Sequence, residues 1–231
     1  MAADRLPAAR FAVACEHALV AEAVRAALDE RALDAAVLAW PDPAGTAPPP
    51  AHERGEFQAG LLLTSLDRWS RLRQVEALLA SVPTRWVVLT DVPRGPEWGV
   101  VAEGGAVAVL PSNAALDQVA VTLVAAARGE LGLGAAERDE LAAQWADLKA
   151  RRADLGARVG TLTPRERQVL DMLYAGDSVT HIAHLLEVSP ATVRSQVKAV
   201  LRKLGVSSQL AAVAALSYFI EGEDLGAPAR P

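Results

Sequence analysis

Two helix starts near the end of the chain constrain its fold most strongly. Thr163-Pro164 and Ser189-Pro190 each place a hydroxyl side chain directly before a proline, the preferred order for an N-cap and the first helical residue. Glu166 lies three residues after Thr163, at the spacing of a capping box. Gly176 and Gly205 then stop the two helical patterns. With a short helix from Ser178 and a last one over 207–219, the region 161–220 is predicted to be an all-α domain of four helices.

The helix predicted over 190–204 has two chemically different faces. Its apolar positions form one stripe: Val193, Val197, Val200, Leu201 and Leu204. Arg194, Lys198 and Arg202 follow each other at intervals of four on another face. The chain as a whole carries a formal charge of −5, but residues 161–218 hold 6 Lys/Arg against 4 Asp/Glu. A helix with one buried face and one basic row suits the DNA major groove.

The segment LTPRERQVLDMLYAGDSVTHIAHLLEVSPATVRSQVKAVLRKLGVSSQLAAVAAL resembles the LuxR/NarL-type helix-turn-helix. Region four of sigma factors shares its opening, but there the helix usually continues into a basic end without GVSSQLAAVA. The resemblance implies a sequence-specific transcription regulator that binds double-stranded DNA as a homodimer. It places Arg194, Ser195 and Lys198 at base-reading positions and Thr192 at a phosphate. Further phosphate candidates are Arg165, Gln196, Arg202 and Lys203.

The second helix departs from the family habit. Val179-Thr180-His181 stands where Asn-Lys-Glu is common, so phosphate contacts from this helix are not expected.

Upstream, short apolar runs alternate with helical patterns. Continuously apolar strands separated by helices predict a doubly wound α/β domain over 10–130, built on a five-stranded parallel sheet. A Pro-rich loop at 41–57 replaces the helix expected between strands two and three. The strands are predicted over 11–15, 34–40, 60–65, 85–90 and 106–110, and the later helices over about 68–81, 95–104 and 114–129.

This domain resembles the receiver domain of response regulators. In receivers, two acids after the first strand hold Mg²⁺, and an Asp at the end of the third strand accepts the phosphoryl group. A hydroxyl side chain ends the fourth strand and a lysine ends the fifth strand. Here the first pair reads Cys15-Glu16, the acceptor position Ser65, the hydroxyl Thr90 and the lysine position Ser112. Asp67 lies two residues late. We therefore expect a degenerate phosphorylation pocket, an atypical receiver without aspartyl phosphorylation, and Cys15 as a small core residue.

Residues 131–160 are predicted to be a linker, with one long helix over 136–159. Leu141, Leu148 and Leu155 recur every seven residues, with Trp145 beside them. This seam either packs on its own domain or joins two chains, and three heptads do not decide between these alternatives.

Composition excludes several classes of function. A single cysteine allows no intrachain disulfide and fits a reducing cytoplasm, and no signal peptide or apolar run of membrane-spanning length is found. We see no metal cluster, no cofactor motif and no catalytic constellation, so an enzyme is not expected. Two alternatives to a plain regulator stay open. A small molecule could bind the degenerate pocket, or the chain could act as an interaction module on RNA polymerase or a partner regulator.

Overall fold

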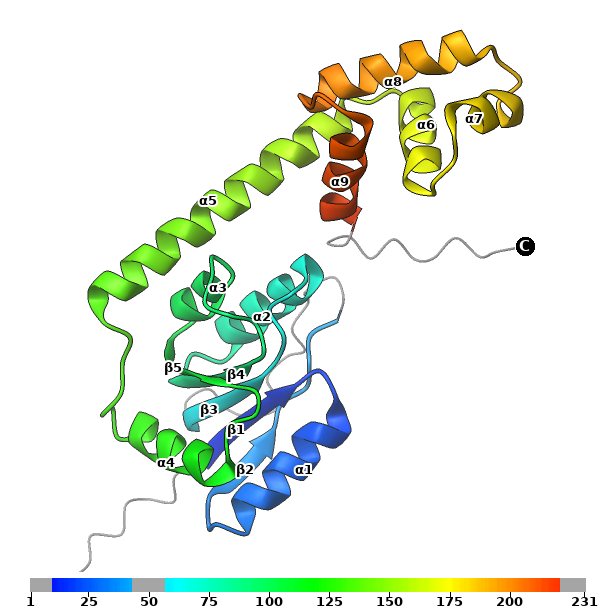
Figure 1. Cartoon of the computed structure of the whole chain (residues 1–231). Helices are drawn as coiled ribbons and strands as arrows, with labels where there is room; N and C mark the ends of the chain where they lie inside the picture. The colour runs from blue at the N-terminus through cyan, green and yellow to red at the C-terminus, as the bar shows by residue number, and fades with distance from the viewer. Residues whose placement is uncertain (1–9, 43–56, 221–231) are drawn as a thin grey trace, which may run out of the picture. The chain divides into compact units, whose positions relative to one another are not determined.

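The computed structural model describes residues 10–42 and 57–220. The chain divides into two compact units, 1–146 and 147–231 (Figure 1). The division falls inside one long helix, α5 (Ala135–Gly160), which we had predicted as a separate linker. Each unit is described by itself.

A parallel sheet organises the N-terminal unit. Its strands are β1 (Arg10–Cys15), β2 (Asp34–Val37), β3 (Phe57–Leu63), β4 (Trp86–Thr90) and β5 (Ala106–Pro111). All pair in parallel in the order β2-β1-β3-β4-β5. This is the flavodoxin-like doubly wound order, which confirms the predicted α/β class. β2 lies on one side of β1 and β3 on the other, so the strand order reverses at β1. The crevice of such a fold opens at this point, at the carboxyl ends of β1 and β3.

Helices cover both faces of the sheet. On one face, α1 (Ala18–Asp29) and α4 (Leu116–Ala127) contribute Ala21, Leu28, Val119 and Leu123 to one core cluster. The other face is covered by α2 (Trp69–Ser81) and α3 (Trp98–Glu103) (Figure 1). Leu72 and Val75 of α2 and Val100 and Val101 of α3 are buried. β4 is buried along its whole length, as expected for a central strand of a two-sided sheet.

The predicted bounds of two strands were wrong. β2 ends at Val37 rather than residue 40, because its ladder with β1 stops where Val13 pairs with Val37. β3 begins at Phe57 and ends at Leu63, so Ser65 lies beyond the strand. Phe57 and Ala59 pair with Arg10 and Phe11 across a register shift, which a count of apolar residues does not reveal. The Pro-rich loop lies largely outside the described residues, since 43–56 are not among them.

The first turns of α5 pack on their own unit. Leu141 and Trp145 are each 1% exposed, and the Trp145 ring centroid lies 5.2 Å from that of Trp69. Gly99 on α3 leaves the space that Trp145 and the Leu141 carbonyl fill, since a Cβ there would overlap both. Arg94 pairs with Glu140 at 3.2 Å. Part of the predicted heptad seam is therefore used within a single chain.

The C-terminal unit is all-α. After the end of α5 come α6 (Pro164–Tyr174), α7 (Val179–Leu185), α8 (Pro190–Leu204) and α9 (Gln209–Ile220), as predicted. The predicted capping box is present: Glu166 N–H donates to Thr163 Oγ1 at 3.3 Å, and Thr163 N–H donates to Glu166 Oε2 at 2.7 Å. Ser189 caps α8 by accepting from Thr192 N–H, and Gly205 ends α8 in the left-handed region at φ 70°.

Within the part of the chain that the structure describes, no single helix has the length and apolarity to cross a membrane. Pro190–Leu204 and Gln209–Ser217 meet that test only as a pair bent by 58°.

Candidate nucleic-acid interface

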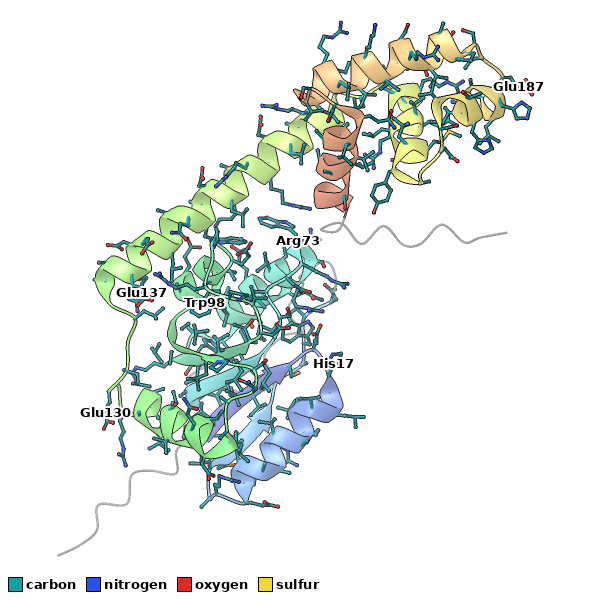
Figure 2. The ribbon with its side chains drawn as sticks, viewed as in Figure 1. His17, Arg73, Trp98, Glu130, Glu137 and Glu187 are labelled. Carbon is teal, nitrogen blue, oxygen red and sulfur yellow. The ribbon has the colours of Figure 1, made fainter. Side chains whose placement is uncertain are left out.

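One surface of α8 carries an unpaired basic row. Arg194, Lys198 and Arg202 are exposed, while Val193 and Val200 on the opposite face are fully buried. None of the three basic side chains hydrogen-bonds or ion-pairs with another described residue. Their charges are therefore available to an anionic partner, because no described acidic side chain neutralises them. α8 is the long orange helix that follows α7 in Figure 1, and Figure 2 draws its side chains on the same ribbon.

The start of α8 favours a phosphate. Thr192 is exposed, and its Oγ1 lies 2.9 Å from the Oγ of the cap Ser189. A 15-residue helix presents partly unsatisfied N–H groups and a positive dipole end at this point. Ser195 is also exposed and donates from Oγ to the Ala191 carbonyl at 3.1 Å. Thr192, Arg194, Ser195, Lys198 and Arg202 thus share one accessible helix surface.

Of the other three candidates, Lys203 and Arg165 make hydrogen bonds inside the unit, and Gln196 is half-buried. Lys203 Nζ donates to the Thr161 carbonyl at 2.9 Å and to Glu166 Oε2 at 2.6 Å. Arg165 donates to the Leu186 carbonyl at 3.2 Å. Gln196 is half-buried, and its Oε1 is buried without a hydrogen-bond partner among the described residues. A role of these three in phosphate binding stays a prediction.

The helix before the turn has no arginine or lysine. Thr180, His181 and His184 are its exposed polar side chains, and His181 Nε2 lies 3.6 Å from Asp177 Oδ1. This composition agrees with the expectation that α7 contributes little to phosphate binding.

Glu166 links the start of α6 to the end of α8. The hydrogen bond from Lys203 and the one from the Thr163 N–H hold the pKa of the Glu166 carboxyl below its ordinary value. Glu166 is 9% exposed. The pair was not predicted from sequence, because the two residues are 37 positions apart and each has an ordinary surface context in its own helix.

Glu166 should make the C-terminal unit sensitive to acid. Because its pKa is lower in the folded than in the unfolded chain, its contribution is complete above the ordinary glutamate pKa of about 4.3 and is lost as pH falls through the folded pKa. Glu166→Gln is expected to cost about 1 kcal/mol at neutral pH and to flatten stability against pH below about 5. Urea unfolding at several pH values measures the stability loss at neutral pH and the dependence of stability on pH.

Asp171→Asn, on the same helix, is the control. Equal acid dependence in wild type and Glu166→Gln would contradict the role given to Glu166.

The residues predicted for the degenerate pocket meet at the carboxyl edge of the sheet. Cys15 ends β1, Ser65 follows β3, Thr90 ends β4 and Ser112 follows β5. Cys15 is buried, and burial raises the pKa of its thiol, in keeping with a core residue rather than a reactive one. Thr90 Oγ1 accepts from the Val92 N–H at 3.2 Å, so this hydroxyl serves the local turn.

An arginine that the sequence reading missed occupies this edge. Arg71 of α2 lies 2.6 Å from Glu16 Oε2 and 3.1 Å from Asp67 Oδ1, and its side chain is only 19% exposed. The spacing of four from Asp67 was a usable signal, but the pairing with Glu16 depends on the fold. The donor set does not fit Mg²⁺, because a single acid follows β1 and a guanidinium already neutralises it. Among the described residues, no group of three or more His, Cys, Asp and Glu could hold a metal ion.

The capped helices α7 and α8, with the short turn between them, form a helix-turn-helix. Residues 160–216 match the family described as "Bacterial regulatory proteins, luxR family", so this segment is similar to the domain that this family shares. The Mycobacterium tuberculosis "Probable transcriptional regulatory protein NarL" is 47% identical over 53 residues, 23% of this chain and 24% of that protein. The Escherichia coli "Nitrate/nitrite response regulator protein NarL" is 38% identical over 87 residues, 38% of this chain and 39% of that protein. The chain thus matches between a quarter and two fifths of these relatives' length.

Solved structures align over more of the chain at low similarity. The crystal structure of "Response Regulator ChrA in Heme-Sensing Two Component System" is 22% identical with a TM-score of 0.40, covering 94% of this chain and 100% of that one. The response regulator StyR is 21% identical with a TM-score of 0.38, covering 91% of this chain and 99% of that one.

Proposed function

We propose that this chain is a sequence-specific DNA-binding transcription regulator that reads the major groove with α8. The observation that carries the proposal is the row Arg194, Lys198 and Arg202. These side chains are exposed and have no partner among the described residues, on a capped helix whose opposite face is buried. The luxR-family match over 160–216 supports it, as do relatives named as transcriptional and response regulators. We propose that it binds as a homodimer to two half-sites about one helical turn apart.

Selection of genomic DNA fragments on the purified full-length chain tests this function. A common motif with two spaced half-sites is the expected result, with an affinity that falls steeply as salt increases. Recovery of fragments without any shared motif would contradict sequence-specific binding.

We also propose that the N-terminal unit works without aspartyl phosphorylation. The acceptor position is Ser65, the lysine position is Ser112, and Arg71 already pairs with Glu16 and Asp67. A carboxylate held by a guanidinium is a poorer nucleophile. The position directly after β5 holds Ser112, so a lysine that would offset the charge of a transferred phosphoryl group is missing there.

Incubation with acetyl phosphate and Mg²⁺ is therefore expected to leave the mass of the chain unchanged. Intact-mass spectrometry measures this directly, and peptide mapping locates any modification. Releasing the carboxylates with Arg71→Ala should not restore the reaction, since the lysine is still missing. A phosphoryl mass on Asp67 or Glu16 of the wild-type chain would contradict the proposal.

A further inference from the structure

An arginine in the last turns of α5 caps the C-terminal end of α8. Arg158 Nη1 donates to the carbonyl of Leu204, the last residue of α8, at 3.2 Å. Its Nη2 lies 2.9 Å from Asp154 Oδ2, one turn earlier on α5, so the guanidinium is held from both sides. A cation at a helix C-terminus also interacts favourably with the helix dipole. Arg158 therefore satisfies a terminal carbonyl that α8 cannot satisfy itself.

The residue after α8 makes room for this contact. Gly205 has φ 70°, and a Cβ at this position would overlap Arg158 Nη1. Glycine thus serves both the left-handed helix end and the close approach of the guanidinium.

Apolar and polar contacts tie the same two helix ends together. Val159 of α5 belongs to a core cluster with Val200 and Leu204 of α8, and Leu155 packs against it. In the opposite direction, Lys203 of α8 donates to the carbonyl of Thr161, just after α5. The ends of α5 and α8 are therefore joined by reciprocal hydrogen bonds above a shared core.

We infer that Arg158 is a positioning residue for DNA binding: it fixes the C-terminal end of α8, so that Lys198 and Arg202 are presented to the groove in one orientation. This inference rests on the proposed function. Arg158 lies before the segment 160–216 that matches the luxR family, so the functional DNA-binding unit includes the end of α5. A small change in the tilt of α8 moves its basic row relative to the bases, and base recognition depends closely on such geometry.

Variants of Arg158 and of Arg151 on the same helix distinguish a positioning role from a general effect of positive charge. Arg151 lies seven residues earlier and pairs only with Asp147, four positions before it, among the described residues. In the full-length chain, Arg158→Ala is expected to weaken binding to the selected site about three- to tenfold, the range of one hydrogen bond. Arg158→Lys should recover part of the affinity, because an ammonium can also donate to the carbonyl. Arg151→Ala should leave it unchanged.

The salt dependence distinguishes positioning from contact. A residue that does not touch phosphate leaves the slope of log affinity against log salt unchanged, whereas loss of one phosphate contact reduces it by about one. Amide exchange of Gly205 and Val206, measured without DNA, should be faster in Arg158→Ala. An unchanged affinity, a reduced slope, or an affinity loss that merely follows the unfolded fraction would overturn the positioning role. If the wild-type chain selects no DNA at all, this result contradicts the proposed function itself and not only the positioning role of Arg158.

Discussion

Replacing Arg194 and Lys198 together by alanine is expected to abolish site-specific DNA binding while the C-terminal unit stays folded. Both side chains are exposed and unpaired among the described residues, so their removal breaks no hydrogen bond or ion pair there. Each contact of such a side chain with a base edge is worth about 1–3 kcal/mol. Loss of both should therefore cost about 2–6 kcal/mol, or roughly 30-fold to more than 10⁴-fold in affinity. Fluorescence anisotropy on the selected site measures this loss, and circular dichroism checks the fold.

Arg167→Ala is the matched control for charge. Arg167 lies on α6 of the same unit, and its charge is already paired with Asp171 at 2.9 Å. Its removal should change the binding only slightly through the overall field. Wild-type affinity in the double variant, or an equal loss in Arg167→Ala, would show that α8 does not read the site.

The C-terminal unit could be predicted almost completely because its signals are local. Caps, prolines and terminating glycines act within one helical turn, and the apolar stripe of α8 needs no knowledge of the partner helix. Two contacts that the sequence did not reveal join residues far apart in the chain. Lys203 with Glu166 and Arg158 with Leu204 are the two pairs, and each decides whether a basic side chain is available to DNA.

The N-terminal unit shows the same division between local and long-range information. Strand number, parallel pairing and the residues at the carboxyl edge follow from apolar runs and their spacing. The ends of β2 and β3 depend instead on where the neighbouring strand stops pairing, and the Arg71–Glu16 pair depends on α2 lying beside the end of β1. Sequence therefore predicted which groups a phosphorylation site lacks here, but not the arginine that holds the remaining acids.

The heptad pattern of α5 left two alternatives, packing on its own domain or a seam between two chains, and a variant of Trp145 distinguishes them. Trp145 is buried against Trp69 within its own unit, so Trp145→Ala is expected to destabilise that unit by about 3–5 kcal/mol, the usual cost of removing a buried tryptophan. Urea unfolding followed by circular dichroism and tryptophan fluorescence measures the loss. If α5 served mainly as a seam between chains, the same change would alter the monomer–dimer equilibrium and leave the unfolding of the unit nearly unchanged.

Gly99→Ala tests the same contact from the other side. The added methyl group would overlap the Cβ of Trp145 and the carbonyl oxygen of Leu141, and a backbone atom cannot move aside as a flexible side chain can. Overpacking of this kind costs about 1–3 kcal/mol, so the variant should unfold at a lower urea concentration than wild type. Gly132→Ala is the control, since nothing lies within 4 Å of a Cβ there. Equal stability of the two glycine variants would mean that α5 does not dock on α3 in solution, and the dimer seam would then be the better account of the heptads.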